Sequence, residues 1–146
     1  MIQRIQTLYM LGALVCTGLL LAFPVWQALP TMEAFGQFPY GIGARSYPLC
    51  LLLLLLNGIG LLAAIFTFKK RKLQGYLIFV AMLLQWLYLG CSWIVVYMQR
   101  ENFDHFSWSE VKAGSILPII SILLLALAAG GVRKDERLIR SMNRMR

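Results

Sequence analysis

Long apolar runs separated by short polar segments dominate the pattern of this chain. Four runs cover about residues 8–26, 48–68, 75–98 and 116–132. A helix needs about 20 largely apolar residues to cross a bilayer, and only helices or closed barrels satisfy their backbone hydrogen bonds in lipid. None of the runs shows the alternation of a membrane β-strand. The sequence therefore predicts an all-α fold, a polytopic membrane four-helix bundle.

The fourth run is the shortest, and the residues before it contain a candidate helix start. Ser107 and Glu110 have the spacing of a capping box, which predicts that the helix begins near Trp108. Pro118 would then lie inside the helix and kink it, because proline lacks the N–H that the helix ladder needs. We expect a membrane helix that is longer than the apolar run alone.

The C-terminal tail, residues 133–146, has a helical periodicity of its own. Its apolar and basic side chains fall on different faces, formed by Leu138, Ile139, Met142 and Met145 and by Arg137, Arg140 and Arg144. This pattern predicts a basic amphipathic helix that either continues from the fourth run or bends to lie on the membrane surface.

Composition agrees with a membrane protein of one domain, residues 1–146. Apolar residues make up 60% of the 146 residues and charged residues 14%, against roughly half and a quarter in soluble domains. A soluble chain of this length has too little interior to hide that much apolar side chain. The first run exceeds the 7–15 apolar residues of a signal peptide, so we expect an uncleaved helix there.

The net charge of +8 raises the question of nucleic-acid binding, but the charges lie at the ends of the apolar runs. Eleven of the fourteen Lys and Arg residues fall on one side of the predicted membrane, and the other side holds Arg45, Arg100 and Lys112. Cytoplasmic loops collect Lys and Arg. We therefore expect both termini in the cytoplasm, outer loops at 27–47 and 99–113, and no nucleic-acid partner.

The chemistry within the four runs is sparse, because they contain no Asp, Glu, Lys, Arg or His. Ion-coupled transport normally uses ionisable groups at membrane depth. Cys16, Cys50 and Cys91 form no CxxC motif, lack the spacing of a redox dithiol, and are expected to pack as small hydrophobic residues. The sequence predicts no catalytic, cofactor-binding or metal-binding residue and no cofactor.

Two amides stand out, Asn57 in the second run and Gln85 in the third. The short connection between these runs makes them antiparallel neighbours, so the two amides lie at similar depth. We expect them to face the bundle and to hydrogen-bond to each other or to nearby backbone as helix-packing groups. The alternative is a solvated substrate path.

Ionisable residues near the membrane surfaces allow a third hypothesis, that the chain is an enzyme. The outer loop holds Glu101, Asp104, His105 and Glu110, and the cytoplasmic edge holds Asp135 and Glu136. Carboxylates and a histidine permit acid–base or metal chemistry, but their spacing matches no motif. We interpret them as solvated charges and predict that the chain is not an enzyme.

Several short segments are similar to a known family. Residues 1–7 (MIQRIQT), 71–74 (RKLQ), 133–136 (RKDE) and 138–141 (LIRS), followed by Arg144, resemble an uncharacterised family of small four-helix inner-membrane proteins of Bacteroidota. The similarity spans the whole chain and its specific matches lie at the predicted cytoplasmic ends. The resemblance implies the topology and an address in the bacterial inner membrane, and it implies no activity.

The leading hypothesis is a non-enzymatic accessory or scaffold subunit of a larger bacterial inner-membrane assembly, with protein export and envelope biogenesis among the candidates. The alternative is a small transporter, channel or lipid-handling protein with a path near Asn57 and Gln85. We expect membrane protein partners and anionic lipid headgroups to bind the basic residues of the cytoplasmic side, which are Lys69, Lys70, Arg71, Lys72, Arg133, Lys134, Arg137, Arg140 and Arg144.

Overall fold

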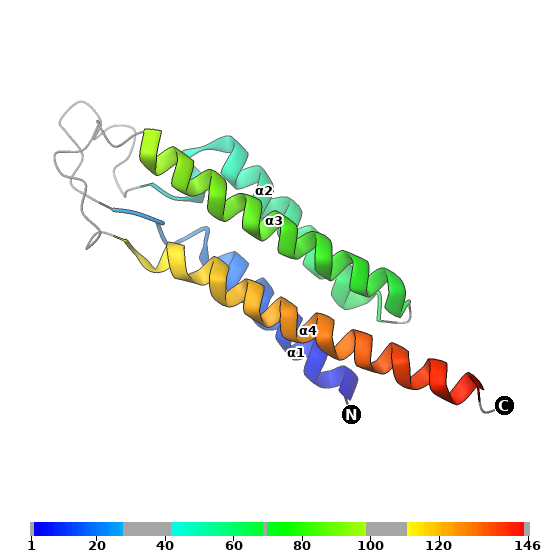
Figure 1. The fold of residues 1–146 in the computed structure, drawn as a ribbon. Helices are drawn as coiled ribbons and strands as arrows, with labels where there is room; N and C mark the ends of the chain where they lie inside the picture. The colour runs from blue at the N-terminus through cyan, green and yellow to red at the C-terminus, as the bar shows by residue number, and fades with distance from the viewer. Residues whose placement is uncertain (1, 28–41, 69, 99–110, 145–146) are drawn as a thin grey trace, which may run out of the picture.

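The computed structural model describes residues 2–27, 42–68, 70–98 and 111–144, with the side chains of 2–4 and 136–144 outside this description. Four helices, α1 (Ile2–Leu19), α2 (Pro48–Phe66), α3 (Arg71–Met98) and α4 (Ala113–Arg144), pack as a bundle, and a short 3-10 helix, η1 (Ala44–Ser46), precedes α2. Figure 1 shows neighbouring helices antiparallel, with both chain ends and the α2–α3 turn at the same end of the bundle. The fold is the predicted all-α bundle.

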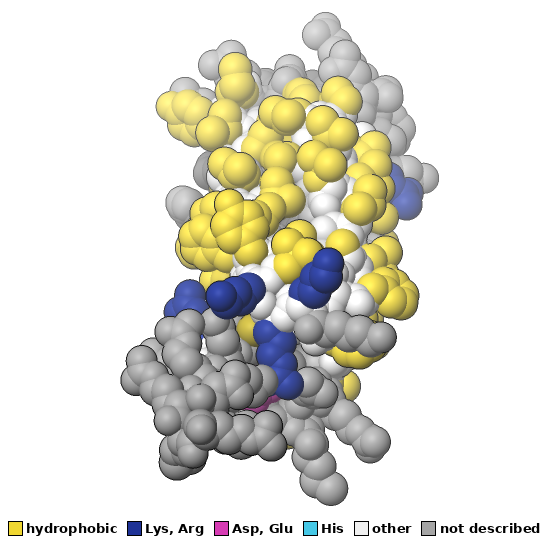
Figure 2. Space-filling model, turned by 90° about the vertical axis from the view of Figure 1, so that its right-hand side faces the viewer, with side chains coloured by type: hydrophobic (Ala, Val, Ile, Leu, Met, Phe, Trp, Pro, Cys, Tyr) yellow, Lys and Arg dark blue, Asp and Glu magenta, His cyan; other side chains and the backbone are white. Residues whose placement is uncertain are grey.

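Three helical stretches are long and apolar enough to cross a membrane, Pro48–Phe66, Arg71–Met98 and Ala113–Asp135. They indicate a multi-pass membrane protein. The apolar stretch Ile5–Leu19 of α1 is shorter. Many large apolar side chains are exposed, including Phe66 at 76% and Leu8 at 66%, and Figure 2 shows such side chains over the body of the bundle. Lipid can solvate this surface, whereas water would penalise its exposure.

The buried positions of each helix alternate at spacings of three and four residues. On α2 they are Cys50, Leu54, Asn57, Leu61 and Ala64. On α3 the same spacing runs through Gln74, Ile78, Ala81, Gln85, Tyr88 and Ser92. This repeat keeps one stripe of a helix against its neighbours, as in a coiled coil. Polar residues therefore share the buried stripe with apolar ones.

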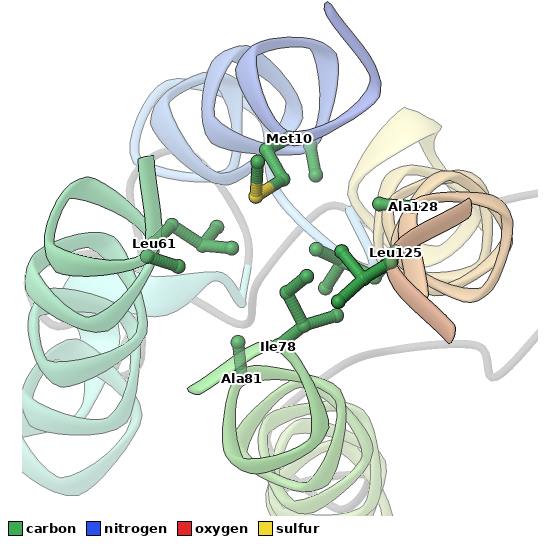
Figure 3. Packing of buried hydrophobic residues seen from close by; sticks show 9 residues of the cluster. Met10, Leu61, Ile78, Ala81, Leu125 and Ala128 are labelled. Atoms are coloured by element: carbon green, nitrogen blue, oxygen red, sulfur yellow. The ribbon is translucent and has the colours of Figure 1, made fainter. Parts of the chain in front are cut away.

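The largest core cluster lies where the four stripes meet. Met10, Leu61, Ile78 and Leu125, one from each helix, are all fully buried, and Figure 3 shows them pointing toward one another. Val132 and alanines at positions 13, 64, 81 and 128 complete the cluster, and the alanines let the helix backbones approach. α1 packs mainly on α4 and α2 mainly on α3, and of the four interfaces between adjacent helices that of α1 with α2 is the smallest.

The first apolar run does not form the helix predicted over residues 8–26. α1 begins at Ile2 and ends at Leu19. Beyond it the amides of Leu21 and Ala22 bond only three residues back, and Pro24 has no N–H to donate. The chain then turns into a separate segment, in which Val25 N donates to Ile42 O at 2.8 Å.

Trp26 joins three distant segments at this end of the bundle, in what we call the Trp26 junction. Its backbone forms isolated antiparallel bridges to Ile42 and to Val111, and its side chain is fully buried. Because Val111 is held in a bridge, α4 begins at Ala113, and the prediction of a start near Trp108 is wrong. Gly114 N then donates to Pro24 O at 3.0 Å, which ties the first turn of α4 to the end of the first run.

α4 continues without interruption from Ala113 to Arg144, with Pro118 inside it. The segment 133–144 is therefore a continuation of the fourth helix, one of the two alternatives that its periodicity allowed. At the other connection, Lys70 N donates to Thr67 O at 3.0 Å, which closes the tight turn between α2 and α3.

Candidate functional site

The two amides singled out from the sequence lie together in the bundle interior. Asn57 on α2 and Gln85 on α3 are buried, with at most 1% of either side chain exposed. Asn57 Nδ2 donates to Gln85 Oε1, and it also lies 3.4 Å from Ala81 O. The pair joins α2 to α3, as expected for polar groups that hold helices together in a membrane.

Four buried polar atoms of the described chain find no protein partner. They are Asn57 Oδ1, Gln85 Nε2, Tyr88 Oη and Ser121 Oγ. Tyr88 lies one helical turn from Gln85 on the same stripe of α3, and Ser121 belongs to α4. An unsatisfied polar group is costly in a membrane interior. These atoms therefore keep the capacity to bind water or a polar solute.

Most of the described basic side chains gather at the end of the bundle that holds the α2–α3 turn, while Arg45 and Lys112 lie at the opposite end. Lys70, Arg71 and Lys72 stand at the start of α3, and Arg133 and Lys134 belong to the late part of α4. Figure 2 shows Lys and Arg side chains between the apolar body and one end of the molecule. Lys69 lies outside the described residues, and Arg137, Arg140 and Arg144 lie on α4 with side chains that are not described.

A groove between α3 and α4 brings the two basic segments together. It has a volume of about 550 Å³, and Arg71 and Lys72 of α3 and Arg133 of α4 all line it. Its remaining lining is small or apolar, with Gly75 and Gly130 among the residues at its surface. The sequence pattern predicted a basic side of the protein but not this groove.

Sequence reasoning also missed a buried polar cluster beside the basic end. Gln6 Nε2 of α1 donates to Asp135 Oδ2 of α4 at 2.9 Å, and both side chains are buried. Gln74 Nε2 of α3 donates to Ala64 O of α2 at 3.2 Å and lies 3.8 Å from the Met10 sulfur. Together these contacts connect all four helices. Only the burial stripe on each helix could have indicated the cluster, since 129 residues separate Gln6 from Asp135.

Gly131 makes room for the Gln6 side chain on the surface of α4. A Cβ at this position would lie 2.8 Å from Gln6 Cγ and 3.0 Å from Gln6 Nε2. A side chain at position 131 would therefore displace the Gln6 side chain from the path on which it reaches Asp135. Gly131 is therefore a positioning residue for this hydrogen bond.

Two of the three cysteines lie side by side, contrary to the expectation that none forms a dithiol. Cys50 Sγ of α2 is 3.6 Å from Cys91 Sγ of α3, and both are free thiols. Cys16 lies on α1 and is also free. The antiparallel pairing of α2 and α3 produces this proximity, which a separation of 41 residues hides in the sequence.

The remaining candidates contribute no described site. Glu101, Asp104, His105 and Glu110 lie outside the described residues, as do Ser107 and Trp108, and Glu136 lies on α4 with a side chain that is not described. Within residues 2–27, 42–68, 70–98 and 111–144, no three His, Cys, Asp or Glu residues form a group that could hold a metal ion.

Comparison with known families gives one result. The family model described as Domain of unknown function (DUF4293) matches residues 2–145. No curated protein and no solved structure matches the chain.

Proposed function

We propose, from the premise that the chain belongs to the DUF4293 family, that it is a non-enzymatic accessory or scaffold subunit of a larger assembly in the bacterial inner membrane. Protein-export and envelope-biogenesis machineries are candidate assemblies. The proposal is that the bundle interior maintains the fold, while its lateral and cytoplasmic surfaces contact other components.

The use of buried polar groups as ties between helices carries this proposal. Gln6 bonds to Asp135 between α1 and α4, and Asn57 bonds to Gln85 between α2 and α3. Gln74 adds a second α2–α3 tie through Ala64 O. Apolar clusters pack the bundle from the Trp26 junction to the basic end. Groups that are engaged in holding helices together favour a structural role over a catalytic one.

The proposed orientation puts the chain termini and the α2–α3 turn in the cytoplasm. The positive-inside rule supports it, because eleven of the fourteen Lys and Arg residues belong to that end. Anionic headgroups of the inner leaflet would attract these residues, at about 1 kcal/mol for each charge near the surface. Membrane protein partners would dock on the same basic end.

Purification of the full-length protein from its native membrane in mild detergent tests the role. We expect companion proteins in fixed stoichiometry, measured by quantitative mass spectrometry. A triple variant should co-purify with smaller amounts of these companions; it combines Arg137→Gln, Arg140→Gln and Arg144→Gln. The pair Arg45→Gln and Lys112→Gln, which removes charge at the opposite end, is the control and should retain them. A preparation that contains only copies of this chain would contradict the proposal.

The orientation has a test of its own. A single Lys70→Cys variant, in a chain whose Cys16, Cys50 and Cys91 are changed to Ser, is treated in intact cells with a membrane-impermeant maleimide. We expect no labelling until the cells are opened. Labelling in intact cells would show that the α2–α3 turn lies outside the cytoplasm and that the proposed orientation is wrong.

The unpartnered polar atoms favour a second candidate, a small transporter, channel or lipid-handling protein with a path near Asn57 and Gln85. Asn57 Oδ1 and Gln85 Nε2 have hydrogen-bonding capacity that the described protein does not use. Solute flux through reconstituted vesicles that disappears with Asn57→Leu, and persists with Ser121→Ala, would support this candidate over the scaffold role.

A further inference from the structure

The groove between α3 and α4 combines charge and apolar surface in a way that points to one class of ligand. We propose that it is a binding site for an anionic phospholipid, whose phosphate lies at the basic end and one of whose acyl chains lies along the groove. The inference does not depend on the accessory role proposed above.

The floor of the groove is formed by residues with little or no side chain. Gly75 of α3 and Ala126, Ala129 and Gly130 of α4 line it. A Cβ at Gly130 would meet nothing within 4 Å, and a Cβ at Gly75 would make only an ordinary contact of 3.7 Å with Val132. The two helices are therefore not sealed together here, and the space of about 550 Å³ is open to the surroundings.

The walls of the groove are apolar along the direction of the membrane normal. Tyr76, Phe79 and Met82 of α3 succeed one another away from the basic end. Met82 follows Arg71 by eleven positions, which span about 16 Å at a rise of 1.5 Å per residue. Half of a hydrocarbon core of about 30 Å has the same depth, so the groove matches the acyl region of one leaflet.

The opening of the groove at the basic end carries three positive charges. Arg71, Lys72 and Arg133 line it from the two helices. Asp135, the only acidic residue among the described side chains, is buried and accepts a hydrogen bond from Gln6. Arginine binds phosphate through two parallel N–H donors. Basic pockets between transmembrane helices at the cytoplasmic side are suited to phospholipid headgroups.

The positive charge at the opening of the groove and the length of its apolar part together favour one class of ligand. A free phosphate would use the cationic end but would leave the apolar groove unfilled. A zwitterionic lipid would fill the groove but would bring an additional positive charge near the arginines. An anionic phospholipid of the same leaflet satisfies both parts, with its phosphate between α3 and α4 and its chain over the glycines.

Lipid titration of the purified full-length chain tests this assignment. The chain is placed in phosphatidylcholine nanodiscs, phosphatidylglycerol is added as the probe, and bound lipid is counted by native mass spectrometry after release from the disc. Arg71→Gln with Arg133→Gln should weaken binding about 25-fold, at about fivefold for each charge. Arg133→Gln alone should weaken binding about fivefold. Lys134→Gln is its charge-matched control, because Lys134 neighbours Arg133 without lining the groove, and it should change binding by no more than about twofold.

The shape of the groove is tested separately, with its charges retained. Gly130→Leu should fill the groove and reduce phosphatidylglycerol binding about tenfold. If Gly130→Leu does not fold, Ala126→Leu is used in its place, because Ala126 lines the same groove one helical turn away. Gly60→Leu on α2 is the matched control, because a Cβ at Gly60 also meets nothing within 4 Å, and it should leave binding unchanged.

Competing ligands separate the lipid from its alternatives. Inorganic phosphate at millimolar concentration should not displace phosphatidylglycerol, because it lacks an acyl chain. Displacement by phosphate, equal loss with Lys134→Gln, or unchanged binding in a folded Gly130→Leu or Ala126→Leu protein would each overturn the proposal. So would release of a co-purified membrane protein by Gly130→Leu while the lipid remains bound.

Discussion

The contact between Gly114 and the backbone of Pro24 allows a sharp prediction about the Trp26 junction. In Gly114→Ala, the new Cβ would lie 2.3 Å from Pro24 O, 2.5 Å from Pro24 C and 2.7 Å from Val25 N. All three are backbone atoms, so no side-chain rotation can relieve the overlap. The start of α4 must move away from residues 24–25.

The cost follows from what that movement disrupts. Overfilling a packed site costs about 1–3 kcal/mol. Displacement also weakens the bond from Gly114 N to Pro24 O and the bond from Ser115 Oγ to Val25 O, at about 1 kcal/mol each. We therefore expect the free energy of unfolding of Gly114→Ala to fall by about 3 kcal/mol.

Gly90 supplies the matched control. It lies on α3, and a Cβ there would meet nothing within 4 Å. Gly90→Ala should leave stability unchanged or raise it by up to about 1 kcal/mol, because alanine loses less backbone entropy in a helix. The assay is reversible unfolding in mixed micelles with increasing dodecyl sulfate, followed by circular dichroism. If the two variants unfold at the same midpoint, the close approach inferred at the junction is wrong.

Three further predictions concern the buried polar groups and the thiols. Gly131→Ala should push Gln6 out of position and lower the free energy of unfolding by about 1–2 kcal/mol through the lost bond to a carboxylate, measured by the same micelle assay. Asn57→Leu removes an interhelical amide bond worth about 0.6 kcal/mol, so purified yield and helicity should persist. Copper phenanthroline added to membranes should crosslink Cys50 with Cys91, detected as one internal disulfide by mass spectrometry after proteolysis.

Each of these variants has a control within the chain. Gly75→Ala, whose Cβ would make an ordinary contact of 3.7 Å with Val132, should be neutral where Gly131→Ala is destabilising. Cys16 should remain alkylatable after oxidation, because the chain has three cysteines and the crosslink between Cys50 and Cys91 leaves Cys16 without a thiol partner. A crosslink that includes Cys16, or equal stability of the two alanine variants, would contradict the packing described here.

The prediction of helices from apolar runs succeeded best where each run could form its helix independently. The second run, 48–68, became Pro48–Phe66, and the third, 75–98, lies within Arg71–Met98. The proline at the start of α2 has a preset φ and needs no helical N–H partner in the first turn. The pairing of Asn57 with Gln85 was also predictable from the sequence, because the short turn between α2 and α3 places the two amides at similar depth.

The first run and the start of α4 could not be predicted in the same way. Residues 20–26 are as apolar as a helix would require, yet they leave α1 because Trp26 pairs with residues 42 and 111. The Gln6–Asp135 bond depends likewise on segments at opposite ends of the chain. No local pattern encodes such partners, because they meet only after the helices have packed.

The amino-acid sequence alone determined the solvent, the number of helices and the concentration of charge at one end, because transfer of apolar side chains into lipid depends on composition over about 20 residues. The tertiary structure decided which stripe of each helix faces inward. Lipid is as apolar as a leucine core and offers no hydrophobic gain for helix association, so the hydrophobic pattern is nearly the same on both faces. The inward-facing stripe is instead set by small residues, by interhelical amide bonds and by the Trp26 junction. The same packing leaves the basic groove between α3 and α4.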